Sequence, residues 1–314
     1  MSQRVLVTGA TGFVGGRLAR ELAAEGAEVR CLVRSRSGDG ARALEREGFS
    51  LHQGDVLDPG SLRGAGTGID AAYYLIHSMG RGNPGEFAAR ERAGAIAFAQ
   101  MARAEGIERV IYLGGLGEGH SRHLRSRHET ALVLREHGPA LTYFRAGMVV
   151  GPESESYRTL RYLVQRLPAM IAPAWLRNKT QPIHVDDTLA FLVASLALES
   201  STGREIQIGG PDVLSYGEML DRMAVILGIP RRPRVPVPLI TPWLSSLWIG
   251  LVTPVDAGVA RPLIEGLASP TVVTDPEPMR EFGIATIGFD EALRRAVAAD
   301  PELSRARPAG RARG

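Results

Sequence analysis

Short apolar runs alternate with helix-forming segments through the first half of the chain, and this alternation restricts the possible folds most. The predicted strands cover residues 5–7, 29–33, 49–52, 71–76, 110–113 and 141–144. Helices are predicted between them over residues 14–24, 41–47, 86–105 and 126–137. Strands that are joined through helices by short links pair in parallel and use right-handed crossovers. The pattern therefore predicts an α/β fold built on a doubly wound parallel sheet.

The alternation stops after about Gly151, where prolines such as Pro168, Pro182 and Pro230 break the chain into short pieces. Helical patterns persist over residues 188–198, 216–227 and 290–299, with strands predicted at 205–208 and 271–274. We expect a first domain, a smaller C-terminal α+β lobe that returns some elements to the sheet, and a disordered tail. Their predicted ranges are 1–150, 151–300 and 301–314.

Composition excludes several kinds of function. The single cysteine, Cys31, rules out an internal disulfide and a four-cysteine zinc site. A net charge of +3, without a basic stripe on any predicted helix, argues against nucleic-acid binding. No leader-like segment precedes the first strand, so a cytoplasmic location is expected. No oligomeric state is predicted.

One late segment, from Leu239 to Val255, is strongly apolar. It contains Pro242 and Pro254 and is shorter than the roughly 20 apolar residues that cross a bilayer. The segment is compatible with a hydrophobic substrate or with peripheral contact to a membrane or a partner. Ordinary packing inside the second lobe is the plainer interpretation.

A glycine-rich turn follows the first strand and opens the first helix. Gly9 permits the tight turn, Gly12 lets backbone amides approach a pyrophosphate, and Gly15 allows close packing of the helix. The helix start adds unpaired N–H groups and the positive end of the dipole. In this strand–turn–helix context the spacing predicts a Rossmann-type dinucleotide site. Its predicted contacts are Gly9, Thr11, Gly12, Phe13, Val14 and Gly15.

The end of the second strand indicates which dinucleotide is bound. NAD sites place Asp or Glu there for the ribose hydroxyls, whereas this chain has Arg34 and Arg36 and no acid. A guanidinium pairs with the additional phosphate of NADP(H), which a carboxylate would repel. We therefore predict NADP(H), with Arg34 as the main contact and Arg36 as a weaker one. The alternative is that both arginines are merely solvated.

The third and fourth strands also end in candidate contacts. Asp55, followed by Val56, suits an acceptor for the adenine amino group, although a cap for the next helical segment is an equal alternative. Ile76 and His77 follow the fourth strand and should lie beside the adenosine–pyrophosphate part of the site. No His, Asp and Glu cluster has metal-ligand spacing.

Together, these segments resemble the atypical and extended short-chain dehydrogenase/reductases, a resemblance carried by 8–15, 32–34, 54–56 and 185–187. Other segments are similar to a narrower bacterial group: 73–79, 112–117, 123–127, 251–255 and 261–263. That group comprises NAD(P)H-binding proteins related to NmrA-like proteins and to the NAD(P)-binding accessory subunit of respiratory complex I. The resemblance covers about residues 3–299 and implies a nicotinamide cofactor.

The catalytic pattern of that family is missing. Its members use a tyrosine as general acid, a lysine four residues later, and a serine or threonine after the fifth strand. Here the only lysine is Lys179, and Trp175 stands four residues before it. Gly114 and Gly115 occupy the place of the serine.

His123 and Arg127 stand in place of the tyrosine and lysine, and their i, i+4 spacing puts them on one helix face. A nearby guanidinium holds the imidazole neutral, which makes it a poor acid at pH 7. Three interpretations stay open: His123 as proton donor, the pair as cofactor-positioning residues, and an ordinary solvated face.

Two functions follow. The first is an NADP(H)-dependent oxidoreductase that reduces a small, hydrophobic quinone- or enone-type substrate without the Tyr/Lys acid pair, because the cofactor itself carries the hydride. The second is a non-catalytic NADP(H)-binding module, acting as a redox sensor or as part of a complex. A DNA-binding role is disfavoured, because no recognition helix is evident.

Overall fold

The structure is a computed structural model of the 314-residue chain, and it describes residues 2–76, 84–117, 122–167, 170–172, 174–236 and 269–306. The chain divides into two compact units, each composed of separated segments. Unit 1 comprises Met1–Ala146, Asp186–Ile208 and Val273–Ile284. Unit 2 comprises Gly147–Val185, Gly209–Val272 and Ala285–Gly314. Two later segments of the chain thus belong with the first 146 residues.

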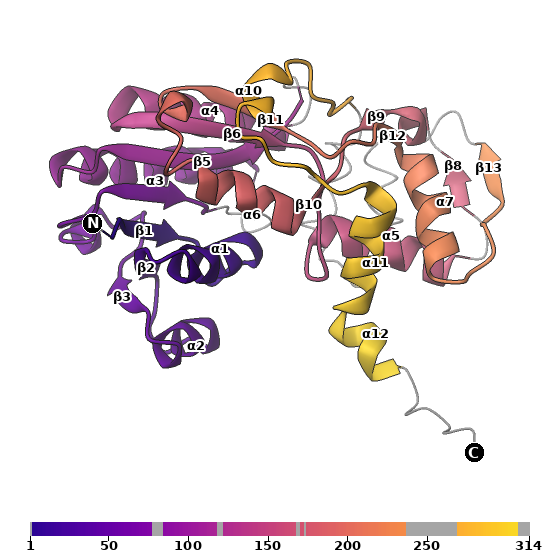
Figure 1. The fold of residues 1–314 in the computed structure, drawn as a ribbon, viewed down its shortest axis with the longest axis horizontal. Helices are drawn as coiled ribbons and strands as arrows, with labels where there is room; N and C mark the ends of the chain where they lie inside the picture. Colours follow the sequence, from indigo (N-terminus) through magenta and orange to yellow (C-terminus); the bar gives the residue numbers. More distant parts are fainter. Residues whose placement is uncertain are drawn as a thin grey trace. The chain divides into compact units, whose positions relative to one another are not determined.

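Unit 1 contains a seven-stranded parallel sheet in the order β11-β6-β5-β4-β1-β2-β3 (Figure 1). Its strands are β1 (Arg4–Thr8), β2 (Glu28–Val33), β3 (Ser50–Gln53), β4 (Ala71–Tyr74), β5 (Arg109–Gly115), β6 (Ala140–Ala146) and β11 (Glu205–Ile208). The strand order reverses at β1, which pairs with both β2 and β4. In such sheets ligands bind at the carboxyl ends of the strands beside this switch point. The predicted doubly wound Rossmann-type sheet is confirmed.

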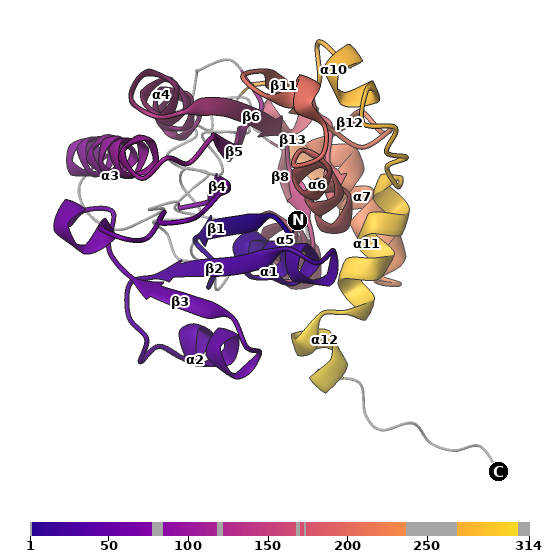
Figure 2. The ribbon, with the colours of Figure 1, turned by 60° about the vertical axis from the view of Figure 1, so that its left-hand side comes forward.

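Helices cover both faces of this sheet (Figure 2). They are α1 (Phe13–Ala24), α2 (Asp39–Arg46), α3 (Pro84–Ala104), α4 (Arg122–His137), α6 (Val185–Ala194) and α10 (Glu277–Arg280). On one face, Phe98 of α3 and Leu134 of α4 pack against the aromatic residues of β4, β5 and β6. On the other, Phe191 of α6 contacts Phe144 of β6. Because both faces are covered, β1 has three consecutive apolar residues, Val5, Leu6 and Val7, rather than an alternating pattern.

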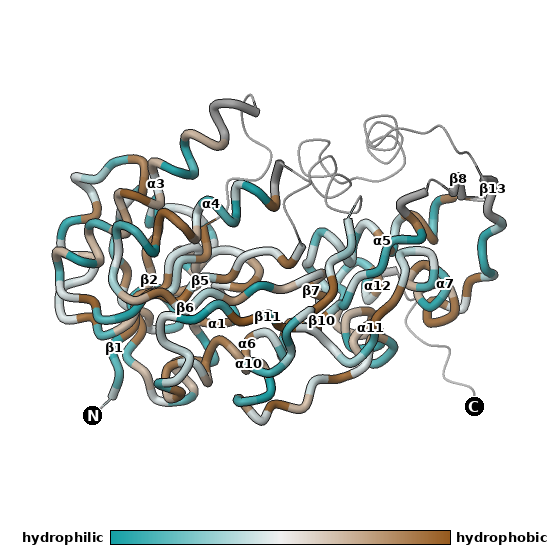
Figure 3. Tube along the Cα trace, turned by 90° about the horizontal axis from the view of Figure 1, so that it is seen from above, coloured by the Kyte–Doolittle hydropathy of each residue, from teal (hydrophilic) through white to brown (hydrophobic). Residues whose placement is uncertain are grey.

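Unit 2 is built mainly from α5 (Glu155–Arg166), α7 (Tyr216–Ile226) and α11 (Phe289–Ala298), which share one apolar core. Short strand pairs accompany them: β7 (Val149–Val150) with β10 (Ile183–His184), β9 (Lys179–Thr180) with β12 (Leu214–Ser215), and β8 (Met170–Ala172) with β13 (Arg234–Pro236). Figure 3 shows polar and apolar residues interleaved along the helices. The cap predicted by Ser154 is present, since its hydroxyl accepts from the Tyr157 amide.

The chain does not become irregular at residue 301. Residues Pro301–Ala306 form a further helix, α12, which corrects the prediction of disorder for the first part of the tail. The physical reason is a long-range one, because Glu302 forms ion pairs with Arg158 and Arg161 of α5. Residues 307–314 lie outside the described part of the chain.

No helix in the described ranges is both long and apolar enough to cross a bilayer. The apolar segment 239–255 lies outside the described residues.

Candidate functional site

The turn between β1 and α1 presents backbone amides at the carboxyl edge of the sheet. Gly9 adopts φ 66°, and the Gly12 amide donates to the Gly9 carbonyl at 2.9 Å. Gly12 is the N-cap of α1, where no side chain caps the helix and no acid occupies the first turn. The amides that begin α1 are therefore available to an anion, and the helix dipole favours one there.

At two positions of this turn the backbone packs so closely against its neighbours that only glycine fits. A Cβ on Gly15 would lie 2.3 Å from the Gly9 carbonyl oxygen, and one on Gly9 would lie 2.5 Å from the Leu75 carbonyl oxygen. The Thr8 hydroxyl ties the same two strand ends together by accepting from the Leu75 amide at 3.0 Å. The predicted roles of Gly9 and Gly15 in a tight turn and close helix approach agree with this geometry. The cradle fits a dinucleotide pyrophosphate.

Arg34 lies just beyond the end of β2 and is exposed. Within the described residues its guanidinium has no hydrogen-bond or ion-pair partner. Arg36 differs, because it donates to the Leu51 carbonyl at 2.7 Å and lies 3.8 Å from the Glu45 carboxylate. A phosphate therefore meets a more available guanidinium at Arg34 than at Arg36. Thr11 contacts the start of α2, where a Cβ on Gly40 would be 3.1 Å from its side chain.

After β3 the sequence leaves two roles open for an aspartate, a helix cap and an acceptor for the adenine amino group, and the helix cap belongs to Asp58 rather than Asp55. The Asp58 carboxylate caps the short 3-10 helix Pro59–Leu62 by accepting from the Gly60 amide at 3.1 Å. The Asp55 carboxylate accepts from the Leu57 amide at 2.9 Å, so it stabilises its own turn. One carboxylate oxygen of Asp55 has this structural task, and a carboxylate can accept further bonds.

The other contacts predicted beside the adenosine are described only in part. Val56 is 8% exposed and packs in the core under α3, which leaves little of its side chain for a ligand. Ile76 is partly buried against the same core. His77 lies outside the described residues.

At the carboxyl end of β5, Arg127 from α4 reaches the glycine pair. Its Nη2 donates to the Leu113 carbonyl at 2.7 Å, while the Tyr112 hydroxyl donates to the Arg127 carbonyl at 3.2 Å. A Cβ on Gly115 would lie 3.8 Å from Arg127 Nε. The structure thus brings Arg127 to the strand end where the family's serine would stand. The backbone of His123 belongs to α4, and its side chain lies outside the described part of the structure.

Two further residues at this strand end were missed by the sequence analysis. Arg145 of β6 donates to the carbonyls of Gly115, at 3.2 Å, and Gly117, at 2.7 Å, and pairs with Glu205 at 2.7 Å. It therefore fixes the turn that follows β5. Tyr143, also on β6, stacks on Tyr112 with a centroid distance of 5.3 Å. The sequence did offer a signal for both residues, because each places a polar group within a mainly apolar strand.

The remaining tyrosines near the sheet belong to the core. Burial raises the pKa of Tyr73, Tyr74 and Tyr112 well above its usual range. Proton release from these phenols is therefore disfavoured at neutral pH. Among the described residues, no group of His, Cys, Asp and Glu side chains has the arrangement of a metal site.

Comparisons with known proteins agree with this geometry. A family model described as NAD(P)H-binding matches residues 9–161. A mitochondrial NADH dehydrogenase [ubiquinone] 1 alpha subcomplex subunit 9 from Arabidopsis thaliana is 29% identical over 74% of this chain, which spans 60% of the plant protein. A 2-alkyl-3-oxoalkanoate reductase from Stenotrophomonas maltophilia is 24% identical over 93% of this chain and 98% of its own length.

Solved structures share the fold. A UDP-glucose 4-epimerase from Thermotoga maritima superposes with a TM-score of 0.71 at 17% identity, covering 97% of this chain and 99% of the epimerase. At this identity the likeness concerns the fold alone.

Proposed function

This chain belongs to the atypical and extended short-chain dehydrogenase/reductases, and we propose that it is an NADP(H)-dependent member that reduces a hydrophobic quinone- or enone-type substrate. The observation that carries the cofactor proposal is the uncapped start of α1 packed on a glycine turn. An exposed guanidinium, Arg34, stands at the end of the neighbouring strand β2. The whole protein's activity, substrate and partners are part of this proposal.

The cofactor would lie across the carboxyl edge of the sheet, with its pyrophosphate at β1. The proposed contacts are Gly9, Thr11, Gly12, Phe13, Val14, Gly15, Arg34, Asp55, Val56, Ile76 and His77. Arg34 would bind the 2′-phosphate, and Arg127 would donate to the ribose hydroxyls on the opposite side of β1. That side follows from the strand order, because β2 and β5 lie on opposite sides of the switch point.

Replacing Arg34 by alanine is expected to weaken NADPH binding by about 10–100-fold, because a charge-assisted bond to phosphate is worth about 1.5–3 kcal/mol. NADH affinity should change little, since NADH lacks that phosphate. Isothermal titration calorimetry of both cofactors with both proteins measures this selectivity. Arg36→Ala is the matched control and should have the smaller effect, because Arg36 is already bonded to Leu51. Equal NADPH and NADH affinities that Arg34→Ala leaves unchanged would refute the NADP(H) preference.

The donor groups at β5 favour a substrate that needs little protonation from the protein. Bound NADPH would supply the hydride. A guanidinium offers hydrogen-bond donors in a fixed geometry, so Arg127 would position groups rather than act as a general acid. The glycine pair adds no hydroxyl. A quinone or a conjugated double bond accepts hydride at an electron-poor carbon, and water or His123 would then provide the proton.

A second function rests on the similarity to the plant protein, which is named as a subunit of NADH dehydrogenase. In this case NADP(H) would be a structural ligand or redox signal within a complex. A sensor must bind the two redox forms with different affinity.

One experiment separates the two functions. NADPH fluorescence is followed after the addition of menadione, other quinones and cinnamaldehyde to the full chain. Steady oxidation above the rate without protein is the result expected for the enzyme. Tight binding with no oxidation across the screen would instead support the module.

A further inference from the structure

We propose that Tyr143 is a second donor to the nicotinamide riboside half of the cofactor, acting beside Arg127 at the end of β5. The inference rests on the proposed dinucleotide binding and adds a residue that the family's pattern does not contain. It starts from buried polar atoms that lack a hydrogen-bond partner among the described residues.

Among the described residues, three buried side-chain polar atoms have no hydrogen-bond partner: Arg127 Nε, Tyr143 Oη and Arg161 Nε. Two of them belong to unit 1, and both adjoin the pair Gly114–Gly115. A buried hydroxyl without a partner loses its bonds to water and gains nothing in return. Phenylalanine at position 143 would keep the stacking on Tyr112 without this loss. The presence of the hydroxyl therefore indicates a function for it.

The position of the hydroxyl points to that function. A Cβ on Gly114 would lie 2.6 Å from Tyr143 Cε2 and 2.8 Å from its hydroxyl oxygen. The phenol from β6 therefore occupies the space that a side chain at position 114 would take. This is the strand end where the family places a serine or threonine hydroxyl. The chain excludes that side chain and brings a hydroxyl from the neighbouring strand.

Tyr143 differs in this respect from the other buried phenols of the sheet. The Tyr73 hydroxyl donates to the Leu192 carbonyl at 2.8 Å, and the Tyr112 hydroxyl donates to the Arg127 carbonyl. Burial raises the pKa of Tyr143, against the opposing effect of the Arg145 and Arg127 charges. The phenol is thus a protonated donor at neutral pH and needs an acceptor.

The strand order identifies the acceptor's source. A pyrophosphate at β1 with its adenosine half toward β2 directs the other half over β4 and β5. The oxygens that arrive at β5 are then those of the nicotinamide riboside. Because the Tyr143 hydroxyl is buried, pairing requires a local adjustment at Leu116–Gly117, where Gly117 has φ 120° and its carbonyl accepts from Arg145.

The test compares Tyr143→Phe with the unchanged full chain by calorimetry, using NADPH and adenosine 2′,5′-bisphosphate. The second probe has the phosphorylated adenosine half and lacks the nicotinamide riboside. Tyr143→Phe should weaken NADPH binding about tenfold, as expected for one buried hydrogen bond, and leave the bisphosphate unchanged. Its melting temperature should be unchanged or higher, because no bond within the protein is lost.

Tyr73→Phe is the matched control. It removes a phenol that has a partner, so it should lower the melting temperature and leave both affinities unchanged. Arg127→Gln combined with Tyr143→Phe should weaken NADPH less than the sum of the two single changes, because the two donors serve one ligand group. A merely structural tyrosine would not produce this coupling.

The outcomes distinguish this inference from the proposed function. Equal NADPH affinity in Tyr143→Phe and the unchanged chain would overturn the role of Tyr143 while leaving dinucleotide binding intact. A chain that binds neither probe would overturn both. If Tyr143→Phe fails to fold, Gly114→Ala displaces the phenol by steric overlap and should show the same selective loss of NADPH affinity.

Discussion

Replacing Asp300 by alanine is expected to lower the free energy of unfolding of unit 2 by about 3–5 kcal/mol, because it removes the buried one of the two carboxylates that pair with the Arg161 guanidinium and leaves only the half-exposed Glu302. Asp300 and Arg161 are each 2% exposed, and Arg161 Nη1 lies 3.0 Å from the Asp300 carboxylate. Circular dichroism of the helices during urea unfolding measures this loss.

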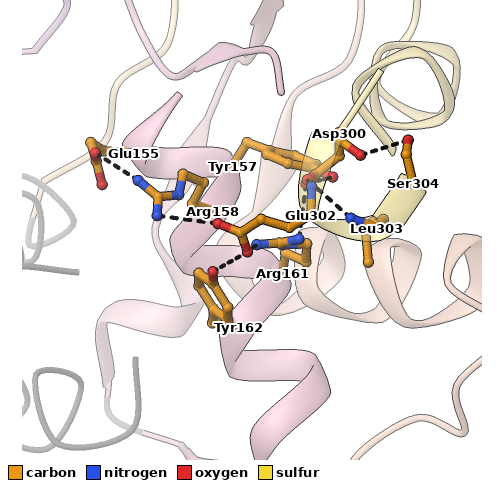
Figure 4. Close-up of polar contacts among 9 residues, drawn as sticks. All are labelled: Glu155, Tyr157, Arg158, Arg161, Tyr162, Asp300, Glu302, Leu303 and Ser304. Carbon is orange, nitrogen blue, oxygen red and sulfur yellow. Dashed lines mark hydrogen bonds and ion pairs between the residues drawn. The ribbon is translucent and has the colours of Figure 1, made fainter. Parts of the chain in front are cut away.

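Several contacts meet at this ion pair (Figure 4). The Tyr157 hydroxyl donates to Asp300 at 3.0 Å, and the other Asp300 oxygen accepts from the Glu302 amide at 2.9 Å. Glu302 then bonds Arg161 Nη2 at 2.5 Å and also binds Tyr162. Loss of Asp300 thus removes the acceptor of the Glu302 amide at the start of α12 together with the buried partner of Arg161, which places the effect at the upper end for a single substitution.

Two further variants isolate the buried charge. Glu291→Ala removes an exposed carboxylate that pairs with Arg294 and Arg295, and it should change stability far less than Asp300→Ala does. Arg161→Met combined with Asp300→Leu removes both charges and should recover most of the loss. A decrease below about 1 kcal/mol for Asp300→Ala would contradict the assignment of a buried, mutually dependent pair.

Replacing Gly15 by alanine is expected to weaken NADPH binding by at least about 100-fold. The new Cβ would lie 2.3 Å from the Gly9 carbonyl oxygen, so either α1 or the glycine turn must move. Both hold the amides proposed to bind the pyrophosphate, so such a displacement would break several hydrogen bonds to it. Each loss of about 1.4 kcal/mol weakens binding tenfold. Calorimetry with NADPH measures the loss, alongside a melting temperature that should also fall.

Leu22→Ala separates general destabilisation from loss of the cradle. Leu22 is 1% exposed on the same helix, and its truncation should cost about 2–5 kcal/mol of stability. NADPH should still bind to the folded fraction with nearly unchanged affinity. If Gly15→Ala bound NADPH as well as Leu22→Ala does, the close approach of α1 to the turn would have no part in cofactor binding.

The sheet was predictable because the residue pattern of each strand indicates whether its faces are buried. Val5, Leu6 and Val7 form an uninterrupted apolar run, which is typical of a parallel strand covered on both faces. The glycine turn was predictable for a related reason. Gly9 and Gly15 are needed by contacts within about ten residues and by the neighbouring strand end at Leu75.

Other features depend on residues far apart in the sequence. Helix α12 is held by Arg161, roughly 140 residues earlier, so the polar composition of the tail alone suggested disorder. Tyr143 and Arg145 act at the end of β5 although they belong to β6, and only the register of the two strands brings them there. The return of some later elements to the sheet was expected from the sequence, and the structure has β11 pairing with β6.

Direct titration tests most closely whether a dinucleotide binds where α1 begins. NADPH and NADP⁺ are titrated separately into the full chain by calorimetry, with NADH for comparison. We expect saturable binding of one molecule per chain, tighter for the phosphorylated cofactors than for NADH. Absence of heat and of saturation for every pyridine nucleotide would contradict the account.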